Sequence, residues 1–245
     1  MAKYRFKRFR DFQEDDLLID LHVHSRWSDG VSTVAELAAG AIQEGLRCMA
    51  ITDHVSANSK FCGELALEIA LSVRELGIPI LSGFEASVSN FDGDLELPGE
   101  ACETADLIIG SVHGIPIGSG LLEVGGMPFS ELAHLETKLC LAIISSGNAD
   151  ILGHAGGLCL NRYKRMDKES LESIVEACAF SGTAFEISAK YHASLIPELL
   201  TILDRHNPTV SIGSDAHNPQ EIGSCTALLR KNWALWRGFA CAASS

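Results

Sequence analysis

Residues 17–54 read LLIDLHVHSRWSDGVSTVAELAAGAIQEGLRCMAITDH, and this stretch decides the fold. Its first and last apolar runs, 17–23 and 48–52, have the length and residue types of buried parallel strands. Between them, apolar side chains recur at helical spacing after Thr33, which with Glu36 three residues later gives a capping-box signature. A strand, a helix and a second strand in this order predict a parallel β-α-β unit.

The same order of strand and helix recurs along the rest of the chain. Five more buried strands are expected at residues 78–83, 107–111, 150–153, 183–187 and 209–212. Helices are expected at residues 34–44, 64–76, 129–146, 168–180, 193–204 and 220–230. Seven strand units in one chain of 245 residues predict a single-domain parallel α/β barrel, one strand short of the usual eight.

Two connections lack a helical pattern. Residues 90–97 (NFDGDLEL) are typical of a turn or hairpin. Residues 114–128 are rich in glycine but lack the G-K-[ST] ending of a phosphate-binding loop. We expect this second stretch to form a mobile loop over the functional site.

The sequence shows no repeat, low-complexity tract or linker that would divide the chain. We expect a basic leader at 1–16, the barrel domain at 17–230 and a C-terminal tail at 231–245. The net charge is −13, yet the leader carries five basic residues before its first acid, namely Lys3, Arg5, Lys7, Arg8 and Arg10. The leader is interpreted as a surface strand or a contact between copies in a homo-oligomer, with a nucleic-acid arm as the alternative.

Several features favour a soluble cytoplasmic protein that does not enter a membrane. No run approaches the roughly 18 apolar residues of a membrane-spanning helix. Residues 1–13 have no apolar core of the kind that a signal peptide requires. The eight cysteines include no C-x-x-C pair and lie mostly in apolar stretches, which indicates buried thiols in a reducing compartment.

Six of the nine histidines lie at the carboxyl ends of expected strands. They are His22, His24, His54, His113, His154 and His217, and the acids Asp29, Glu85 and Asp215 are interleaved with them. In a parallel barrel these strand ends meet on one face, where active sites lie. A lone histidine at a strand end is commonly structural, but six with interleaved acids indicate a metal site.

The number and type of these ligands indicate more than one ion. Residues i and i+2 of a strand point the same way, so His22 and His24 can share a metal. Six imidazoles and three carboxylates suit about three borderline divalent ions such as Zn, Mn or Fe, and Glu85 is the natural bridge. His134 and His206 are interpreted as structural, and for His192 a substrate contact stays open beside a structural role.

Motifs in this order resemble those of the PHP (polymerase and histidinol phosphatase) superfamily. The run 22–30 (HVHSRWSDG) resembles the first motif, 52–54 (TDH) the second and 214–217 (SDAH) the last. Between them, in the expected order, stand GFE ending at Glu85, SVH ending at His113 and GH ending at His154. The resemblance covers about residues 17–218 and implies a distorted seven-stranded α/β barrel.

The segment 83–113 is similar to stand-alone bacterial PHP phosphatases and to the PHP domain of bacterial family X DNA polymerases. The chain has no room for a polymerase, which favours the stand-alone branch. Carried over position by position, the resemblance implies three metal sites. One ion would bind His22, His24, Glu85 and Asp215, a second Glu85, His113 and His154, and a third Asp29, His54 and His217. Some relatives have histidine at the position of Asp29.

This chemistry indicates a metal-dependent phosphoesterase. We expect a water between the first two ions to be the nucleophile, with the ions stabilising the charge of the transition state. Asp53 and Glu186 are expected to orient ligand imidazoles. Lys190 and Arg162 are candidates to hold phosphate oxygens, with solvated surface charges as the alternative.

A positive pocket in an acidic protein selects a compact phosphate over a long anionic polymer. The leading hypothesis is therefore hydrolysis of a small phosphorylated metabolite, similar to the histidinol phosphatase reaction. A phosphodiesterase or 3'-5' exonuclease acting on nucleotides or single-stranded DNA is the alternative enzyme. A metal-binding regulatory module without catalysis is the alternative outside enzymes, although all nine ligand positions are filled.

Overall fold

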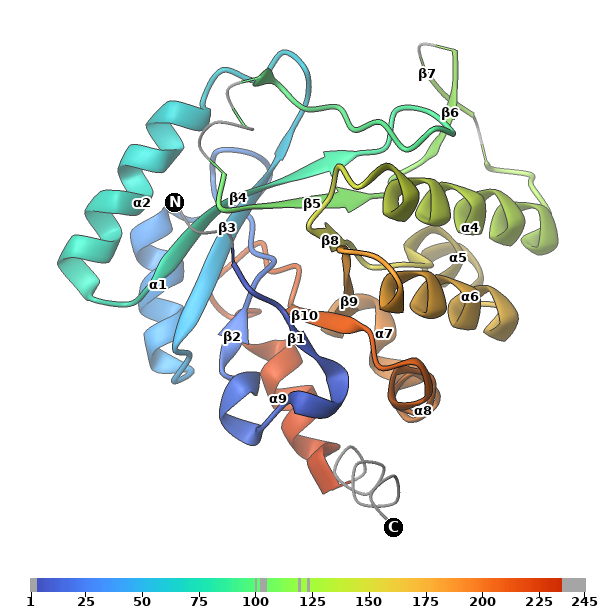
Figure 1. Cartoon of the computed structure of the whole chain (residues 1–245). Helices are drawn as coiled ribbons and strands as arrows, with labels where there is room; N and C mark the ends of the chain where they lie inside the picture. The colour runs from blue at the N-terminus through green and yellow to red at the C-terminus, as the bar shows by residue number, and fades with distance from the viewer. Residues whose placement is uncertain (1–3, 100, 102–104, 119, 123, 235–245) are drawn as a thin grey trace.

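The computed structural model (Figure 1) describes residues 4–99, 101, 105–118, 120–122 and 124–234. Eight strands form one sheet in the order β1-β10-β9-β8-β5-β4-β3-β2. Their bounds are β1 Lys7–Arg8, β2 Ile19–Asp20, β3 Cys48–Val55, β4 Ile80–Ser87, β5 Leu107–Ser111, β8 Ile151–Leu152, β9 Ala184–Ser188 and β10 Thr209–Gly213. The seven strands from β2 to β10 pair in parallel, and only β1 is antiparallel to its neighbour.

Backbone hydrogen bonds also join the two ends of this parallel series. The Leu21 amide donates to the Ile212 carbonyl at 2.8 Å, and the Asp215 amide donates to the His22 carbonyl at 3.0 Å. Val23 and Ala216 form an isolated parallel bridge beyond these bonds. The expected single-domain α/β class with a mostly parallel sheet is confirmed.

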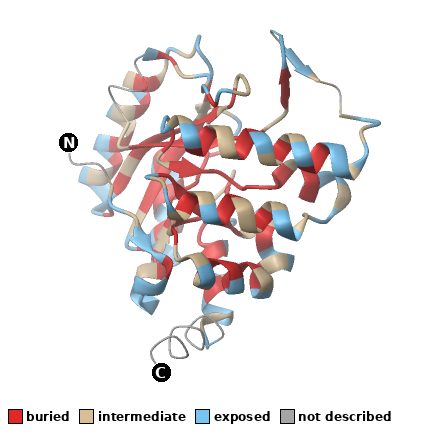
Figure 2. Ribbon diagram, turned by 45° about the vertical axis from the view of Figure 1, so that its right-hand side comes forward, coloured by how far each residue is buried: buried red, intermediate tan, exposed pale blue. Residues whose placement is uncertain are grey.

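Helices cover the outside of the sheet (Figures 1 and 2). Their bounds are α1 Val34–Gln43, α2 Cys62–Leu76, α4 Phe129–Ser146, α5 Gly157–Tyr163, α6 Lys168–Ala179, α7 Ala189–His192, α8 Ile196–His206 and α9 Ser224–Lys231. The capping box that starts α1 is present, since the Glu36 amide donates to Thr33 Oγ1 and the Thr33 amide to Glu36 Oε2. None of the described helices is long and apolar enough to cross a membrane.

The core has two layers, one on each side of the strands. Buried side chains between the sheet and the helices form two large clusters, one under α4, α6 and α8 and the other under α1 and α2. Alternate strand residues point the other way and make a small inner cluster that includes Leu107 and Ile109 of β5. The inner cluster fixes the strands from within while the helices cover them from outside.

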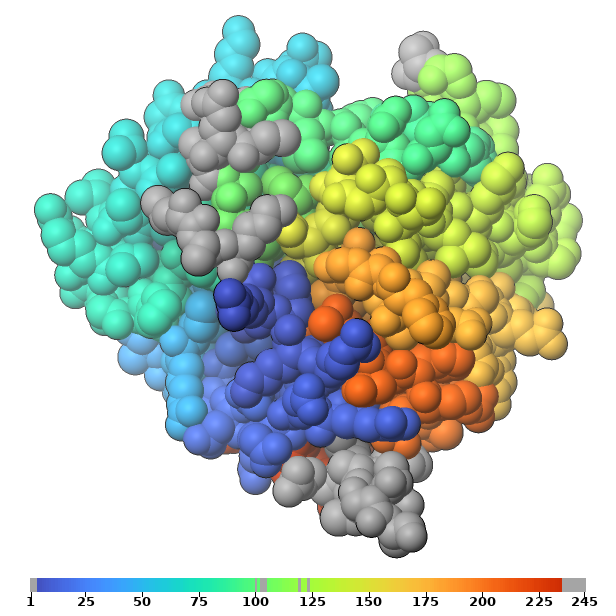
Figure 3. All heavy atoms as spheres, in the orientation of Figure 1, coloured from blue at the N-terminus to red at the C-terminus, as the bar shows by residue number. Residues whose placement is uncertain are grey.

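The N-terminal residues lie against the amino ends of the strands. Lys7 and Arg8 pair with Val210 and Thr209 at the start of β10, and Tyr4 and Phe6 pack on the inner cluster. Figure 3 shows these first residues spread over the centre of this face of the molecule. Part of the basic leader is therefore an exposed strand with packed aromatic residues. Residues 1–3 and 235–245 lie outside the described part of the chain, and the boundaries at 16 and 231 stay predictions.

Several expected elements differ in their bounds. The first strand is only Ile19–Asp20, because the residues before it form a 3-10 helix, Glu14–Leu17. The last helix begins at Ser224 rather than 220, because Gly223 adopts a left-handed conformation (φ 73°) and donates its amide to the buried Asp20 carboxylate. The short helix α5 was not expected.

The two connections without a helical pattern also form defined turns. The hairpin expected at 90–97 is present, with an antiparallel bridge between Val88 and Leu95. The glycine-rich stretch is not a plain loop, because β6 (Ile115–Ile117) and β7 (Gly120–Leu122) pair as a two-stranded antiparallel hairpin. Gly118 has φ 57° at the turn of this hairpin, a conformation that glycine adopts without strain.

Gly213 in β10 has no room for a side chain. A Cβ built there would overlap Glu186 Oε1 and come within 2.6 Å of His22 Cβ. We predict that Gly213→Ala lowers the free energy of unfolding by about 1–3 kcal/mol. Gly182→Ala, where a Cβ meets no atom within 4 Å, is the control and should stay within about 0.5 kcal/mol of the parent. Denaturant unfolding measures both, and equal stabilities would contradict the close approach.

Candidate metal centre

The side chains at the carboxyl ends of the parallel strands converge on one cluster. Their nitrogen and oxygen atoms form four overlapping groups that could each hold an ion, with all atoms of a group within 4.8 Å of one another. The groups are His24, Asp29, His54 and His217; His22, His24 and Asp215; His22, Glu85 and His154; and His54, Glu85 and His113. All nine side chains that the sequence singled out as ligands are therefore brought together.

Glu85 of β4 lies at the centre of this cluster and is 1% exposed. Five imidazoles approach its carboxylate, at 2.9–3.4 Å: those of His22, His24, His54, His113 and His154. Burial alone would raise the pKa of Glu85, but His22 and His113 beside it hold the pKa well below its usual range. Glu85 is thus a buried carboxylate whose ionised form is stabilised by the histidines around it.

The other two carboxylates lie to the sides of Glu85. Asp215 Oδ1 is 3.2 Å from His24 Nε2, and Asp29 Oδ2 is 3.2 Å from His217 Nε2. Asp215 is almost completely buried, whereas the side chain of Asp29 is 54% exposed. The Asp29 end of the cluster is therefore the one most open to solvent.

Unpartnered buried atoms show what kind of ligand this cluster suits. His22 Nε2, both ring nitrogens of His24 and Glu85 Oε2 are buried and have no hydrogen-bond partner. His22 Nε2 and Glu85 Oε2 lie 3.3 Å apart without forming a hydrogen bond. Leaving such groups unpaired is costly, and a shared divalent cation would satisfy them together. Imidazole nitrogens mixed with carboxylate oxygens fit Zn, Mn or Fe.

Surrounding groups fix the orientation of the histidines. Glu186 of β9 accepts a hydrogen bond from His22 Nδ1 at 2.7 Å and from the His154 amide at 2.5 Å. The first bond leaves His22 Nε2 facing the cluster. Burial alone would lower the pKa of His22, but Glu186 and Glu85 raise it well above its usual value. Glu186 therefore has the orienting position that the sequence predicted.

Two of the clustered residues have an unusual backbone conformation. His154 has φ 21° and Asp215 has φ 57°, conformations that residues other than glycine rarely adopt. Such conformations persist where the surrounding structure imposes them, and they gather at functional sites. The Asp215 amide donates a hydrogen bond to the His22 carbonyl, which joins one proposed ligand residue to another.

The remaining predicted residues have different surroundings. Asp53 accepts hydrogen bonds from the amide and hydroxyl of Ser25 and from the Ser28 hydroxyl, at 2.6–2.8 Å, so it fixes the loop after His24 rather than an imidazole. Lys190 Nζ forms an ion pair with Asp215 Oδ2 at 2.8 Å. Arg162 is exposed on α5 with its guanidinium over the Tyr163 ring, and its described contacts do not reach the cluster.

The other three histidines lie outside the cluster. His192 is fully buried, accepts the Ser188 amide at Nδ1 and donates from Nε2 to the Ala155 carbonyl, so its role is structural rather than substrate binding. His134 is exposed on α4. His206 contacts Glu172 at 3.1 Å. The structural interpretation of His134 and His206 agrees with these positions.

The structure adds neighbours that the sequence analysis missed. The Tyr191 ring lies over His154 with centroids 4.6 Å apart, and Ser87 Oγ is 2.7 Å from His113 Nδ1. Buried Glu136 of α4 accepts the Leu158 and Cys159 amides at the start of α5, just beyond His154. In the sequence Glu136 lies within a helical pattern. Only its position on the apolar face of that helix would have indicated that its carboxylate is buried.

The PHP domain family model matches residues 20–190, which include seven of the nine clustered side chains. The chain belongs to the PHP domain family. The Escherichia coli (strain K12) protein named probable phosphatase YcdX is 28% identical to this PHP chain over 223 residues, covering 86% of the chain and 83% of YcdX. Bacillus subtilis DNA polymerase/3'-5' exonuclease PolX is 28% identical over 226 residues, covering 87% of the chain but only 37% of PolX.

A solved structure shows that the PHP fold extends over most of the chain. Histidinol phosphate phosphatase (HISK) from Lactococcus lactis superposes with a TM-score of 0.70 at 22% identity, covering 87% of this chain and 92% of that one. At this identity the likeness concerns the fold. The family and its relatives named probable phosphatases identify the chain as a metal-dependent phosphoesterase.

Because the buried nitrogen and oxygen atoms gain partners when a cation binds, metal should stabilise the folded protein. We predict that adding Zn or Mn to chelator-treated protein raises the Tm by several degrees, and that Glu85→Gln loses most of this rise. Thermal unfolding followed by circular dichroism, with and without metal, measures the effect. A Tm rise of equal size in the parent and in Glu85→Gln would show that the ions bind elsewhere.

Proposed function

We propose that this PHP domain hydrolyses a small phosphomonoester with about three divalent cations held by the nine clustered side chains. The observation that carries the proposal is the set of four overlapping ligand groups, two of which share the buried Glu85 carboxylate. A single ion would leave several of these buried groups unpaired. The proposal distributes three ions over the sites that the family motifs imply, with Glu85 between the first two.

Bound divalent cations would lower the pKa of water and stabilise negative charge on phosphoryl oxygens. Lys190 is placed to add a positive charge at the same site, since it is half exposed and 2.8 Å from Asp215. Burial alone would lower the pKa of Lys190, but its hydrogen bond with Asp215 raises the pKa, so the ammonium stays charged at neutral pH. Lys190 therefore suits electrostatic binding of a phosphate oxygen rather than proton transfer.

Tyr191 borders the same region. Burial raises the pKa of its hydroxyl, so Tyr191 is neutral at pH 7 and can donate a hydrogen bond to phosphate. Arg162 has no contact among the described residues that supports the phosphate-binding role expected for it, and that role stays a prediction. In this proposal the phosphate is met on this side by one cation, Lys190, and one neutral hydrogen-bond donor, Tyr191.

The proposal includes a closed seven-stranded barrel as the scaffold. It is supported by the parallel order from β2 to β10. It is also supported by the backbone hydrogen bonds that join Leu21 to Ile212 and His22 to Asp215. Closure places the ends of the first and last parallel strands beside each other. His22, His24 and Asp215 could then share one ion even though about 190 residues separate them.

A small substrate agrees with the charge of the chain and with its structural relative. The net charge of −13 disfavours an extended nucleic acid, whose backbone is recognised by basic surfaces. The Lactococcus lactis structure is described as complexed with Zn, L-histidinol and phosphate, which are small ligands. We therefore favour a phosphomonoesterase over the exonuclease activity that PolX carries in its name.

We predict that the metal-loaded protein prefers small phosphomonoesters to oligonucleotides, because a compact dianion fits a small positive site inside an acidic surface. The expected salt dependence of kcat/KM is shallow. Phosphate released from a metabolite panel and nucleotides released from short single-stranded DNA, each at two salt concentrations, measure this. Single-stranded DNA as the best substrate, with a steep salt slope, would support the exonuclease alternative.

The ion at Asp29, His54 and His217 should be held least tightly, because this end is exposed and lacks a bridging carboxylate. Burial lowers the pKa of His54 to about 4, so its ring is neutral and able to bind metal at pH 7. We predict that Asp29→Ala loses this ion and its activity, whereas Asp29→His keeps part of both. Elemental analysis, circular dichroism and phosphatase rate are followed during titration with a weak chelator. Loss of all ions together with unfolding would contradict the ranking.

A further inference from the structure

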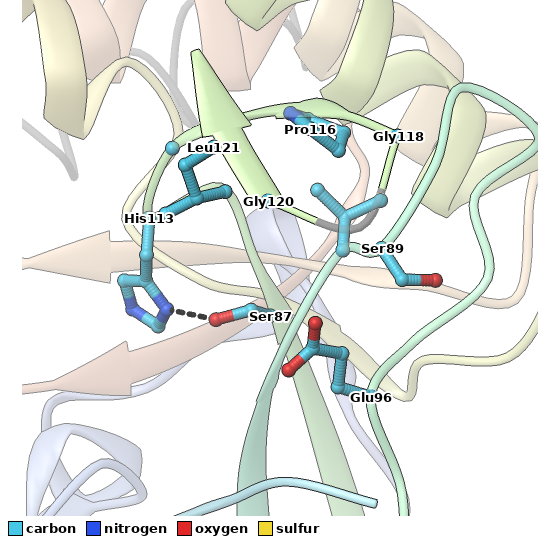
Figure 4. Close-up of a pocket in the computed structure, with 10 residues that line it drawn as sticks. Ser87, Ser89, Glu96, His113, Pro116, Gly118, Gly120 and Leu121 are labelled. Carbon is cyan, nitrogen blue, oxygen red and sulfur yellow. Dashed lines mark hydrogen bonds between the residues drawn. The ribbon is translucent and has the colours of Figure 1, made fainter. Parts of the chain in front are cut away.

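Two histidines contact the same oxygen of Glu85 but are oriented in different ways. The Nε2 atoms of His113 and His154 lie 3.1 and 2.9 Å from Glu85 Oε1. The other ring nitrogen of His113, Nδ1, is 2.7 Å from Ser87 Oγ, a contact that Figure 4 shows. Within the described part of the chain, the His154 ring forms a hydrogen bond only through Nε2. Its direction therefore depends on packing and on the backbone turn that carries it.

The turn after His154 leads into α5, and this helix lacks the usual capping side chain. Gly156 occupies the N-cap position and has no side chain that could accept an amide. Another residue would not fit there, because Gly156 has φ 84° and a Cβ would overlap Met166 Sδ. The amides of Leu158 and Cys159, in the first turn of α5, are thus left without a local acceptor.

Glu136 of α4 supplies the missing acceptors from another helix. Its Oε1 accepts the Leu158 amide at 2.8 Å, and its Oε2 accepts the Cys159 amide at 3.0 Å. The residue is 2% exposed, and burial raises the pKa of its carboxyl group, which the two amides counteract. A carboxylate buried in an apolar helix face costs stability unless hydrogen bonds replace the lost water. The two amides are therefore the partners that account for the position of Glu136.

The start of α5 lies directly against His154. A Cβ built on Gly157 would be 3.1 Å from His154 Nδ1, and the Gly157 amide donates to the His154 carbonyl at 2.9 Å. Glu186 holds the same turn at the His154 amide, and His192 holds it at the next carbonyl. With φ 21° at His154, the turn has a conformation that persists only where surrounding contacts impose it. A displaced α5 would therefore carry the imidazole with it.

We propose that Glu136 is a positioning residue that keeps the His154 imidazole in place to bind the second metal ion. That ion is the one proposed at Glu85, His113 and His154. The inference rests on the proposed function and adds a residue that contacts neither metal nor substrate, because it acts through the first turn of α5. The loss of such support typically lowers metal affinity by about 10–100-fold. The ion proposed beside His217, at the exposed end, should not depend on Glu136.

The test changes Glu136 with little change in volume. Glu136→Gln has the same shape, but its NH2 group faces one backbone amide and leaves that donor unpaired. Glu136→Asp keeps the charge but is one methylene shorter, so it does not reach both amides. Glu131→Gln is the matched control, since it removes the same charge from an exposed position on α4. Ile143→Val is the control for stability, because it removes a buried methyl group from the same helix.

Amide hydrogen exchange of the metal-free protein reports on the contact itself. The Leu158 and Cys159 amides should exchange about tenfold faster in both Glu136 variants than in the parent, because the start of α5 opens more often. In Glu131→Gln and Ile143→Val these two amides should exchange as in the parent.

Zinc titration of protein labelled with ¹⁵N-histidine shows which ligand is affected. In the parent, zinc should shift the Nε2 signals of the six clustered histidines, and His154→Gln assigns the signal of interest. In Glu136→Gln the His154 signal should require about tenfold more zinc, whereas the His217 signal should follow the parent. The phosphatase rate of Glu136→Gln should fall at limiting zinc and recover at excess zinc. Ile143→Val should show neither change.

The outcomes separate this inference from the proposed function. If the two amides exchange faster but His154 binds zinc as in the parent, Glu136 supports only α5, and the inference is wrong while the proposed function stands. Equal exchange rates in the parent and both variants would also overturn it, as would failure of both variants to fold. If zinc shifts no clustered histidine in the parent, both proposals are wrong. If zinc binds but no phosphomonoester is hydrolysed, the proposed function is wrong, and the zinc titration alone decides whether Glu136 positions His154.

Discussion

The structure of the site depends on one buried carboxylate. Glu85 is 1% exposed and lies within 3.4 Å of five imidazoles. A buried charge is tolerated only when opposite charges and hydrogen bonds compensate for the water it has lost. Because Glu85 Oε2 has no hydrogen-bond partner, the neighbouring histidines alone do not compensate it fully. The cluster is therefore best understood as a cation-binding centre built around this anion.

The strand register determines which side chains reach Glu85. His54 of β3 and Ile109 of β5 are its partners in the adjacent strands, so the imidazole and the carboxylate stand side by side on the sheet. Gly213 in β10 leaves the space that His22 and Glu186 occupy. A register shift of one residue would turn these side chains to the opposite face, so packing of the apolar alternate residues also fixes the proposed metal ligands.

The sequence was sufficient to predict which side chains would cluster because they follow strands, and strand ends meet wherever a parallel sheet curves on itself. It was less informative about contacts that depend on side-chain direction. Asp53 precedes His54, and adjacent strand residues point to opposite sides, which explains why Asp53 bonds to Ser25 and Ser28 rather than to an imidazole. Tyr191 and Glu136 reach the His154 turn from other elements, and no local pattern encodes such contacts.

The charges on the two sides of the cluster are of opposite sign. Lys190 stands beside Asp215 after β9, whereas Glu96 lies near His113 on the side of β4 and β5. A phosphate drawn toward Lys190 would be held on the Asp215 side of the cluster rather than beside His113. Binding orientation would then follow from electrostatics before any shape selection. A site of this kind would let an acidic protein bind an anion, because the positive charge of Lys190 and of bound cations would be confined to the cluster while the rest of the surface keeps its negative charge.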